Sequence, residues 1–439
     1  MHPLSPTDGS STDFVPDTIF ALSSGLPPAA IGVIRISGPS AGIALQRLTG
    51  SMPPARRAVL RDLRDGNGDL LDSALVLYFP GPASATGEDC AELQCHGGRA
   101  VVSAVTKSLA QMTGLREAQP GEFTRRAFAN GRIDLAQAEG LADLLSAETE
   151  MQRLAAQAGA GGALSRKTRE WRDTVLKLAA EVELVLDFAD EDDAQDLSAA
   201  FWQRLEDVRA DMREWLERPR AEILREGIRV VLAGPPNAGK SSLFNALVQD
   251  GAAIVSPVAG TTRDAIERSI AFSGIPFVLV DTAGLRDESD DPVETIGIDR
   301  AKDQLKSADI VLWLGSEGQG PADAIEIQSR ADASDCVRKS APDHTVSAVT
   351  GLGVRELERD LIERARLLLP KAGSAALNAR QATLVGQALE SLQGVCEGED
   401  GLLVGESLRQ ARVCFDRLLG QSSTEDMLDQ LFGRFCIGK

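Results

Sequence analysis

A glycine-rich segment at residues 234–241 carries the clearest chemical signal in the sequence. It reads Gly234-Pro-Pro-Asn-Ala-Gly239-Lys240-Ser241, matches the pattern GxxxxGK[ST] and directly follows the apolar run 228–233. Glycines let backbone N–H groups approach phosphates, and a helix beginning here adds positive potential. Lys240 would reach the β- and γ-phosphates, and the Ser241 hydroxyl would bind Mg²⁺. A turn with only a packing role would not require Lys and Ser together.

Further polar residues follow in the order typical of GTPases related to translation factors. Asp281-Thr-Ala-Gly284 comes after the apolar run 275–280, so the aspartate can join the Mg²⁺ shell. The Gly284 N–H can contact the γ-phosphate. Gly260-Thr261-Thr262 lies between the two motifs, where a switch is expected, and one threonine can complete the Mg²⁺ shell.

The position that often orients the attacking water holds an apolar residue. Many GTPases place Gln directly after DxxG, but Leu285 stands here and cannot orient water. Another residue, a cation or a partner must then supply this role. Residues 286–294 offer several carboxylates, although a solvated acidic loop is the simpler interpretation of any one of them.

The base-recognition element departs from its usual pattern, NKxD. The closest string is Ser329-Arg330-Ala331-Asp332, and Ser347-Ala-Val349 is similar to a second base-contacting loop. Asp332 can accept hydrogen bonds from N1 and N2 of guanine, so we expect a guanine nucleotide. Whether Ser329 and Arg330 compensate for the usual residues stays open from the sequence. Residues 315–324 are also too few for a helical crossover, which predicts a missing helix.

Hydrophobic periodicity indicates the elements that position these residues. Apolar runs at 228–233, 275–280 and 310–314 predict parallel strands of a doubly wound α/β domain ending near 370. Helical periodicity flanks this domain on both sides, which predicts one helical domain in two pieces with the α/β domain inserted between them. Two predicted helices carry apolar stripes: Trp171, Val175, Leu178, Val182 and Leu186, then Phe201, Leu205, Val208, Met212 and Trp215. Before them, strands at 31–36 and 74–79 and a helix at 100–112 predict a mixed domain.

Composition excludes several classes of protein. The 439 residues include 46 Lys plus Arg and 65 Asp plus Glu, a net charge of −19 that disfavours nucleic-acid binding over the whole surface. Residues 1–130 are close to neutral, at net −1. No stretch resembles a signal peptide or a membrane span. Six cysteines without CxxC spacing and three histidines indicate neither a disulfide framework nor a zinc site, so we expect reduced thiols in the cytoplasm.

Three further segments identify a family. They are Ala118-Gln-Pro-Gly-Glu-Phe-Thr-Arg-Arg-Ala-Phe128 followed by Asn130-Gly-Arg-Ile-Asp-Leu-Ala-Gln-Ala-Glu139, then Thr86-Gly-Glu-Asp89 through Gly98, and the C-terminal Phe435-Cys-Ile-Gly-Lys439. With PNAGKSS, GTTRD and DTAGLR between them, the sequence resembles the MnmE (TrmE) family of tRNA-modifying GTPases over residues 13–439. GTPases of the Era and Der type share only the nucleotide motifs.

The resemblance implies a multidomain fold of α+β and α/β parts. It implies a tetrahydrofolate-binding and dimerisation domain at 1–130, a helical domain at 131–222 and 372–439, and an inserted P-loop GTPase domain at 223–371. It also implies a homodimer that works with the flavoprotein MnmG in a heterotetramer or larger complex. That complex would add an aminomethyl or carboxymethylaminomethyl group at C5 of the tRNA wobble uridine, with a tetrahydrofolate derivative as one-carbon donor.

The resemblance also assigns site residues. Folate contacts fall on Arg35, Glu92, Arg132 and Lys439, with Arg132 in place of the family's usual Lys. K⁺ contacts fall on Asn237, Ser256, Val258 and Thr261, and the predicted Mg²⁺ ligands are Ser241 and Thr262. Glu294 falls on the family's water-positioning residue and, with Lys240, is the predicted catalytic pair. The predicted GTP contacts are Asn237, Ala238, Gly239, Lys240, Ser241, Ser242, Ser256, Pro257, Val258, Ala259, Gly260, Thr261, Thr262, Asp281, Thr282, Ala283, Gly284, Ser329, Arg330, Ala331, Asp332, Ser347, Ala348 and Val349.

Two other classes of function remain as alternatives. An RNA-binding GTPase of the Era or Der type would carry a basic domain after the α/β domain, but residues 372–439 are helical and net −3. A scaffold without useful GTPase activity is favoured only by the altered base-recognition element.

Cys436 can be a nucleophile, but a tail thiol packed near the folate site is the simpler interpretation. The sequence does not identify the tRNAs or the final uridine product.

Overall fold

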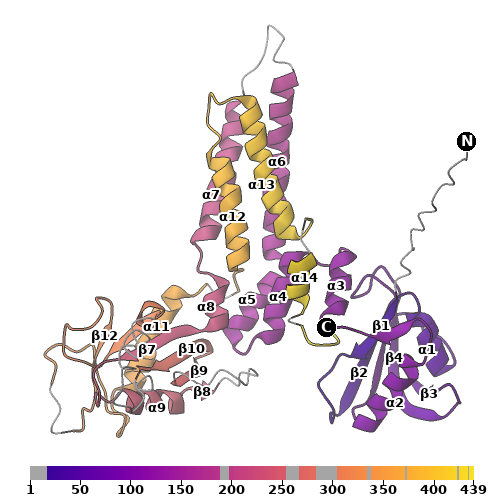
Figure 1. Cartoon of the computed structure of the whole chain (residues 1–439), viewed down its shortest axis with the longest axis horizontal. Helices are drawn as coiled ribbons and strands as arrows, with labels where there is room; N and C mark the ends of the chain where they lie inside the picture. Colours follow the sequence, from indigo (N-terminus) through magenta and orange to yellow (C-terminus); the bar gives the residue numbers. More distant parts are fainter. Residues whose placement is uncertain are drawn as a thin grey trace, which may run out of the picture. The chain divides into compact units, whose positions relative to one another are not determined.

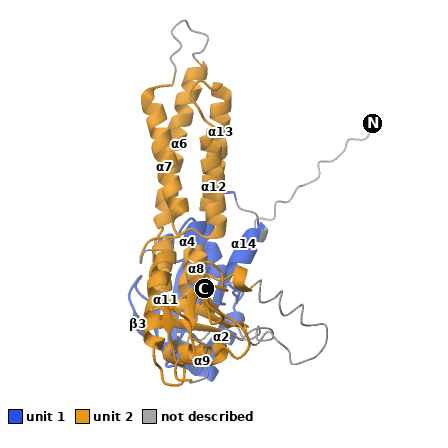
Figure 2. Cartoon of the chain, turned by 90° about the vertical axis from the view of Figure 1, so that its left-hand side faces the viewer, with its two compact units in different colours: residues 1–138, 422–439 blue, residues 139–421 orange. Residues whose placement is uncertain are grey.

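The structure is a computed structural model that describes residues 17–187, 197–253, 266–282, 304–333, 338–370, 373–422, 425–433 and 435–439. The chain divides into two compact units (Figure 2). The first contains residues 1–138 and 422–439, and the second contains residues 139–421. This division is coarser than the four predicted segments, whose boundaries stay a prediction.

The first unit is built on a six-stranded sheet in the order β3-β4-β5-β2-β1-β6. Alternating residues of the central strands, such as Ile34 and Ile36, are buried against the helices α1 (Ala41–Thr49) and α2 (Arg99–Ala110), which share one core with that face of the sheet (Figure 1). The predicted strands and helix of this region are confirmed. The strands are β1 (Thr18–Leu22), β2 (Ile31–Ser37), β3 (Val59–Arg64), β4 (Leu70–Phe79), β5 (Cys90–His96) and β6 (Leu115–Glu117).

The C-terminal residues belong to this first unit. Helix α14 (Glu425–Phe432) contacts α3 (Glu122–Ala129), and Arg125 forms ion pairs with Glu425 and Asp429. A side chain at Gly121 would collide with the Phe432 carbonyl, so the two helices approach closely. The tail reaches β1, where Ser23 Oγ donates a hydrogen bond of 2.8 Å to the Gly438 carbonyl. The last five residues are thereby brought to the end of the sheet.

Four long helices of the second unit lie side by side along their length (Figure 1). They are α6 (Ala163–Asp187), α7 (Ala199–Glu217), α12 (Ala379–Gln393) and α13 (Gly401–Leu419), and two shorter helices precede them, α4 (Leu135–Ser146) and α5 (Glu150–Ala160). The predicted stripes form the core, except that Leu186 is only half-buried. The Trp171 ring centroid lies 6.0 Å from those of Trp215 and Phe415, so three helices meet at this cluster.

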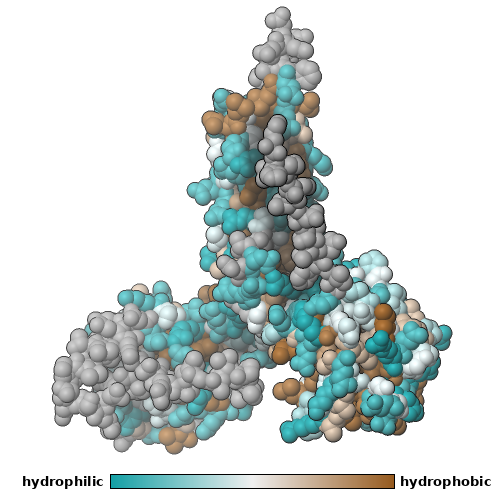
Figure 3. All heavy atoms as spheres, turned by 45° about the vertical axis from the view of Figure 1, so that its right-hand side comes forward, coloured by the Kyte–Doolittle hydropathy of each residue, from teal (hydrophilic) through white to brown (hydrophobic). Residues whose placement is uncertain are grey.

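One end of this bundle exposes large apolar side chains. Leu184 of α6 and Leu402 and Leu403 of α13 are exposed there, and Figure 3 shows hydrophobic surface on that end. In the part of the chain that the structure describes, no helix combines the length and the apolar run needed to cross a membrane.

The α/β part of the second unit contains a seven-stranded sheet in the order β13-β12-β11-β7-β10-β9-β8. Strand β7 is parallel to both β10 and β11, as the apolar runs predict for a doubly wound sheet. Strand β9, which the apolar runs did not predict, is antiparallel to β10. The strands are β7 (Ile228–Ala233), β8 (Ala252–Ala253), β9 (Ile266–Phe272), β10 (Ile275–Asp281), β11 (Ile310–Trp313), β12 (Ile325–Gln328) and β13 (His344–Thr345), and the helices are α8 (Ala221–Glu226), α9 (Lys240–Asp250) and α11 (Val354–Leu368).

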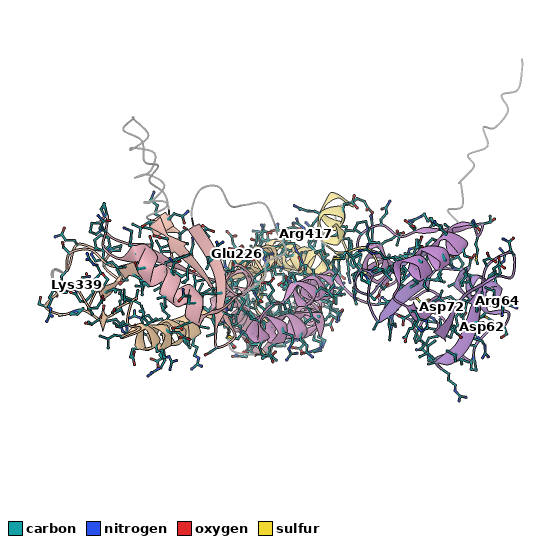
Figure 4. All side chains as sticks on the ribbon, turned by 90° about the horizontal axis from the view of Figure 1, so that it is seen from below. Asp62, Arg64, Asp72, Glu226, Lys339 and Arg417 are labelled. Carbon is teal, nitrogen blue, oxygen red and sulfur yellow. The ribbon has the colours of Figure 1, made fainter. Side chains whose placement is uncertain are left out.

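The crossover between the parallel strands β11 and β12 contains no helix, so the predicted loss of one helix is confirmed. Polar contacts occupy this region instead. Trp313 Nε1 donates to the Ser316 carbonyl at 2.8 Å. Lys339, which is labelled in Figure 4, donates from Nζ to the Trp313 carbonyl at 2.9 Å and pairs with Glu326. Glu326 also accepts from the Gly318 N–H at 3.0 Å. A short loop can therefore replace the helix because the polar groups at this end of the sheet are satisfied.

The chain enters and leaves the α/β part at one place. The Ala221 N–H donates to the Leu377 carbonyl at 3.1 Å, and the Ala379 N–H donates to the Glu222 carboxylate. The entering segment and the returning segment are thus hydrogen-bonded to each other, as the insertion of one domain into another requires.

Candidate nucleotide site

The loop between β7 and α9 has the shape of a phosphate-binding loop. Gly239 and Asn237 take left-handed backbone conformations, with φ of 90° and 59°. A side chain at Gly234 would come within 2.9 Å of the Gly315 nitrogen, so only glycine fits there. Backbone N–H groups of the first turn of α9 lack intrahelical partners and are available to an anion. The loop therefore has the features that phosphate binding needs.

The Lys240 side chain is hydrogen-bonded to backbone carbonyls of this loop. Lys240 is the first residue of α9 and only 6% exposed, and its Nζ donates to the carbonyls of Gly234 at 2.9 Å and Pro235 at 2.8 Å. A buried ammonium must be hydrogen-bonded to remain charged. These two hydrogen bonds hold the Lys240 side chain under the loop, while Ser241 and Ser242 in the next positions are exposed.

Asp281 lies beside the loop because β10 and β7 are parallel neighbours. Asp281 is opposite Leu232 in the register, at the carboxyl end of β10, and is 1% exposed. Thr282 Oγ1 donates to the Leu232 carbonyl at 2.8 Å and fixes the strand end. The structure thus brings Lys240, Asp281 and Thr282 together, as the order of motifs predicts.

The two predicted base-contacting loops also meet. Ser347 is fully buried, and its Oγ donates a hydrogen bond of 2.5 Å to Asp332 Oδ1. The Ala331 N–H donates to the Val346 carbonyl at 3.1 Å. The hydrogen bond from Ser347 lowers the pKa of Asp332, so the carboxylate stays ionised as an acceptor. Ala348 is half-buried beside this contact and Val349 is 82% exposed.

Several predicted residues lie outside the described ranges. They are the switch residues Ser256, Pro257, Val258, Ala259, Gly260, Thr261 and Thr262, and the residues after β10, Ala283, Gly284, Leu285 and Glu294. Within the described residues, no group of three or more His, Cys, Asp or Glu side chains is placed to hold a metal ion. The predicted ligands Ser241 and Thr262 do not require such a group, because phosphate oxygens would complete the Mg²⁺ shell.

A second polar site lies in the first unit. Arg35 of β2 and Glu92 of β5 are cross-strand partners, and Arg35 donates from Nε at 3.1 Å and Nη2 at 2.8 Å to Glu92 Oε1. The Arg35 guanidinium carbon lies 5.9 Å from the centroid of the Phe123 ring. Arg132 is exposed, with its Cγ near Gly87, and Lys439 ends the tail that is bound at Ser23. The predicted folate residues therefore belong to one compact unit.

Two family models match nearly the whole chain. The model described as "GTP-binding protein TrmE N-terminus" matches residues 18–132, and the one described as "MnmE helical domain" matches residues 135–436. A protein of Erythrobacter litoralis with the name tRNA modification GTPase MnmE is 61% identical over 423 residues, with 96% of this chain and 100% of that protein covered. The chain belongs to the MnmE family.

Other MnmE relatives carry the same name. The protein of Novosphingobium aromaticivorans is 56% identical, with 96% of this chain and 100% of that protein covered. The protein of Rhizorhabdus wittichii is 54% identical, with 100% of both chains covered. The chain is therefore a GTP hydrolase of the MnmE family, which acts in tRNA modification.

A cluster of ion pairs in this MnmE chain was not predicted. Arg126 is largely buried and pairs with Asp17 at 2.8 Å, Glu122 at 3.0 Å and Glu88 at 3.2 Å. Burial would lower the pKa of Arg126, but Glu88 and Glu122 raise it above the ordinary value. Arg126 thus connects α3 to the loop before β5. The i, i+4 spacing of Glu122 and Arg126 is the signal in the sequence that could have indicated part of this cluster.

Proposed function

We propose that this chain hydrolyses GTP in the cytoplasm as part of a complex that modifies C5 of the wobble uridine in tRNA. The complex contains a homodimer of this chain and the flavoprotein MnmG, and the product is the aminomethyl or carboxymethylaminomethyl uridine. The observation that carries the proposal is a complete phosphate-binding loop beside an ionised Asp332, in a chain whose full-length relatives are named tRNA modification GTPases.

Each described nucleotide residue has a distinct role in the proposal. Lys240 would exchange its two carbonyl partners for phosphate oxygens and neutralise charge that develops on the β- and γ-phosphates. The Ser241 hydroxyl and Thr262 would bind Mg²⁺, with Asp281 near its outer shell. Asp332 would accept the N1–H and N2–H of guanine, because an ionised carboxylate offers acceptors and no donor.

Leu285 cannot orient the attacking water or stabilise charge on the phosphates, so a carboxylate and a monovalent cation would perform these two roles. K⁺ bound by Asn237, Ser256, the Val258 carbonyl and Thr261 would place positive charge beside the phosphates, where other GTPases use an arginine. Glu294 would orient the attacking water. Hydrolysis would be coupled to the formation and separation of a dimer of α/β domains.

The first unit offers suitable groups for a tetrahydrofolate derivative, which would supply the one-carbon unit. Both hydrogen bonds from Arg35 end on Glu92 Oε1, and the second oxygen, Oε2, is the acceptor that we propose for the pterin edge. Arg132 and Lys439 carry charge that is complementary to the glutamate carboxylates of folate. Phe123 gives the site an apolar wall beside Arg35.

Mass spectrometry of tRNA nucleosides tests the proposed function. Cells that lack this chain should lose the C5 modification of the wobble uridine, and the intact chain should restore it. A chain with Glu294→Gln should bind GTP and fail to restore the modification. Unchanged wobble uridines in the deletion strain would exclude the proposal.

A further inference from the structure

The loop that follows β12 is bound to the phosphate loop through Ser329. Ser329 Oγ donates a hydrogen bond to the Ala238 carbonyl at 2.5 Å, although the two residues are 91 positions apart. Ala238 directly precedes Gly239, the N-cap of α9. Ser329 therefore connects the strand that leads to Asp332 with the loop that would hold the phosphates.

Arg330 lies against the same part of the phosphate loop. A Cβ built on Gly239 would be 3.4 Å from Arg330 Cγ and 3.5 Å from Ser329 Cβ, so both side chains pack directly beside this glycine. Arg330 has a left-handed backbone conformation, with φ of 55°, which is unusual for a residue that is not glycine. Such a conformation persists only where neighbouring contacts hold it.

A third connection fixes the other end of the loop. The Ala331 N–H donates to the Val346 carbonyl, and Ser347 Oγ donates to Asp332. The Thr350 N–H in turn donates to Ser347 Oγ at 3.2 Å. Residues 329–332 are thus attached at one end to the phosphate loop and at the other to the loop after β13. The distance between phosphates and base in a nucleotide is fixed, so these attachments set where Asp332 lies for a bound base.

We propose that Ser329 is the positioning residue that sets this spacing and that the planar Arg330 guanidinium stacks on the guanine base. Together they would replace the Asn and Lys of the NKxD pattern, so the chain keeps its selectivity for guanine nucleotides. Arginine suits this role because its guanidinium is flat and stacks on aromatic rings. The inference rests on the proposed function, since it concerns the same nucleotide.

A matched pair of variants of the full chain tests Ser329. Ser329→Thr keeps the hydroxyl. Ser329→Val has nearly the same shape as the Thr variant but lacks the hydroxyl. We expect ribose-labelled GDP to dissociate roughly fivefold faster from the Val variant than from the Thr variant, because a net hydrogen bond contributes about 1 kcal/mol. Stopped-flow fluorescence measures both rates.

Binding of pyrophosphate provides the control. Pyrophosphate needs only the phosphate loop, so its affinity should be equal in the two Ser329 variants. Equal GDP dissociation from both variants would overturn the inference, as would an equal loss of GDP and pyrophosphate affinity in the Val variant. Failure of the unaltered chain to bind GDP would instead remove the proposed function. The two failures are therefore distinguishable.

Arg330 is tested in the same assays. Arg330→Ala should weaken GDP binding several-fold, and Arg330→Lys should recover only part of it, because lysine has the charge without the flat guanidinium. Pyrophosphate affinity should change little in either variant. Full recovery by lysine, or a matching loss of pyrophosphate affinity, would show a charge effect and contradict stacking.

Discussion

Ser347 donates a hydrogen bond to Asp332 across two loops that are separated by 15 positions in the chain. Ser347 is fully buried, whereas Asp332 is exposed, so the buried hydroxyl fixes one oxygen of an accessible carboxylate. The other oxygen of Asp332, Oδ2, is not the acceptor of this hydrogen bond. This arrangement favours a ligand with two adjacent N–H donors, as guanine has.

Removal of the Ser347 hydroxyl should raise the pKa of Asp332 toward its ordinary value of 3.8. Because the pKa is lowered in the folded chain, the hydrogen bond stabilises the structure above the ordinary pKa, and this effect is lost as pH falls through the lowered value. We expect Ser347→Ala to weaken GDP binding roughly fivefold at pH 7. Carbon NMR of the carboxyl groups follows the titration. An unchanged pKa would contradict the role given to Ser347.

Asp332→Asn should change the preferred base from guanine to xanthine. The introduced amide could still accept from Ser347 through its oxygen, while its NH₂ group would donate to the xanthine O2 carbonyl and oppose the N2 amine of guanine. GTP affinity should fall by about a hundredfold or more and XTP affinity should rise. Calorimetry with GTP, XTP and ATP measures the change. Equal losses for all three nucleotides would exclude a base contact.

Lys240→Met should abolish GTP binding while the chain stays folded. Methionine nearly matches the length of lysine but removes the buried ammonium that donates to Gly234 and Pro235. We expect a loss of at least about a hundredfold in GTP affinity, since a positive charge is lost at the phosphates. Thermal unfolding provides the control for folding. Near-normal affinity would remove Lys240 from the proposed role.

Hydrolysis should depend on K⁺. Exchange of K⁺ for Na⁺ at constant ionic strength should slow phosphate release by roughly tenfold or more, because the larger cation suits the predicted oxygen ligands and its charge stabilises the transition state. Glu294→Gln should also slow phosphate release and leave GTP affinity unchanged. Release of inorganic phosphate measures both effects. Equal rates in the two salts would count against the assignment of Asn237, Ser256, Val258 and Thr261.

Glu92→Gln should weaken binding of tetrahydrofolate without affecting GTP hydrolysis. Glutamine is isosteric with glutamate, but it lacks the charge that pairs with Arg35 and puts a donor where the pterin also donates. We expect a loss of roughly tenfold or more in folate affinity by calorimetry. Glu181→Gln, which breaks the ion pair with Arg204 in the helical bundle, is a matched control that should bind folate normally.

Local sequence patterns predicted the elements well because burial follows short periods. The apolar run 228–233 and the stripe from Trp171 to Val182 are buried as their spacing requires. The helix-free crossover was also predictable, since residue number limits what a connection can contain. Contacts between loops that are distant in the sequence were not predictable. The bond from Ser329 to Ala238 and the pairs of Arg126 with Asp17 and Glu88 depend on how whole elements pack, which no local pattern encodes.

The hydrogen bonds that join residues 221–222 to residues 377–379 have a consequence for the evolution of the chain. Because the inserted segment starts and finishes at adjacent positions, a short turn could replace it and leave the helices before and after it connected. A recombination event with junctions at these positions would exchange the α/β part between relatives and leave the helices of the recipient connected.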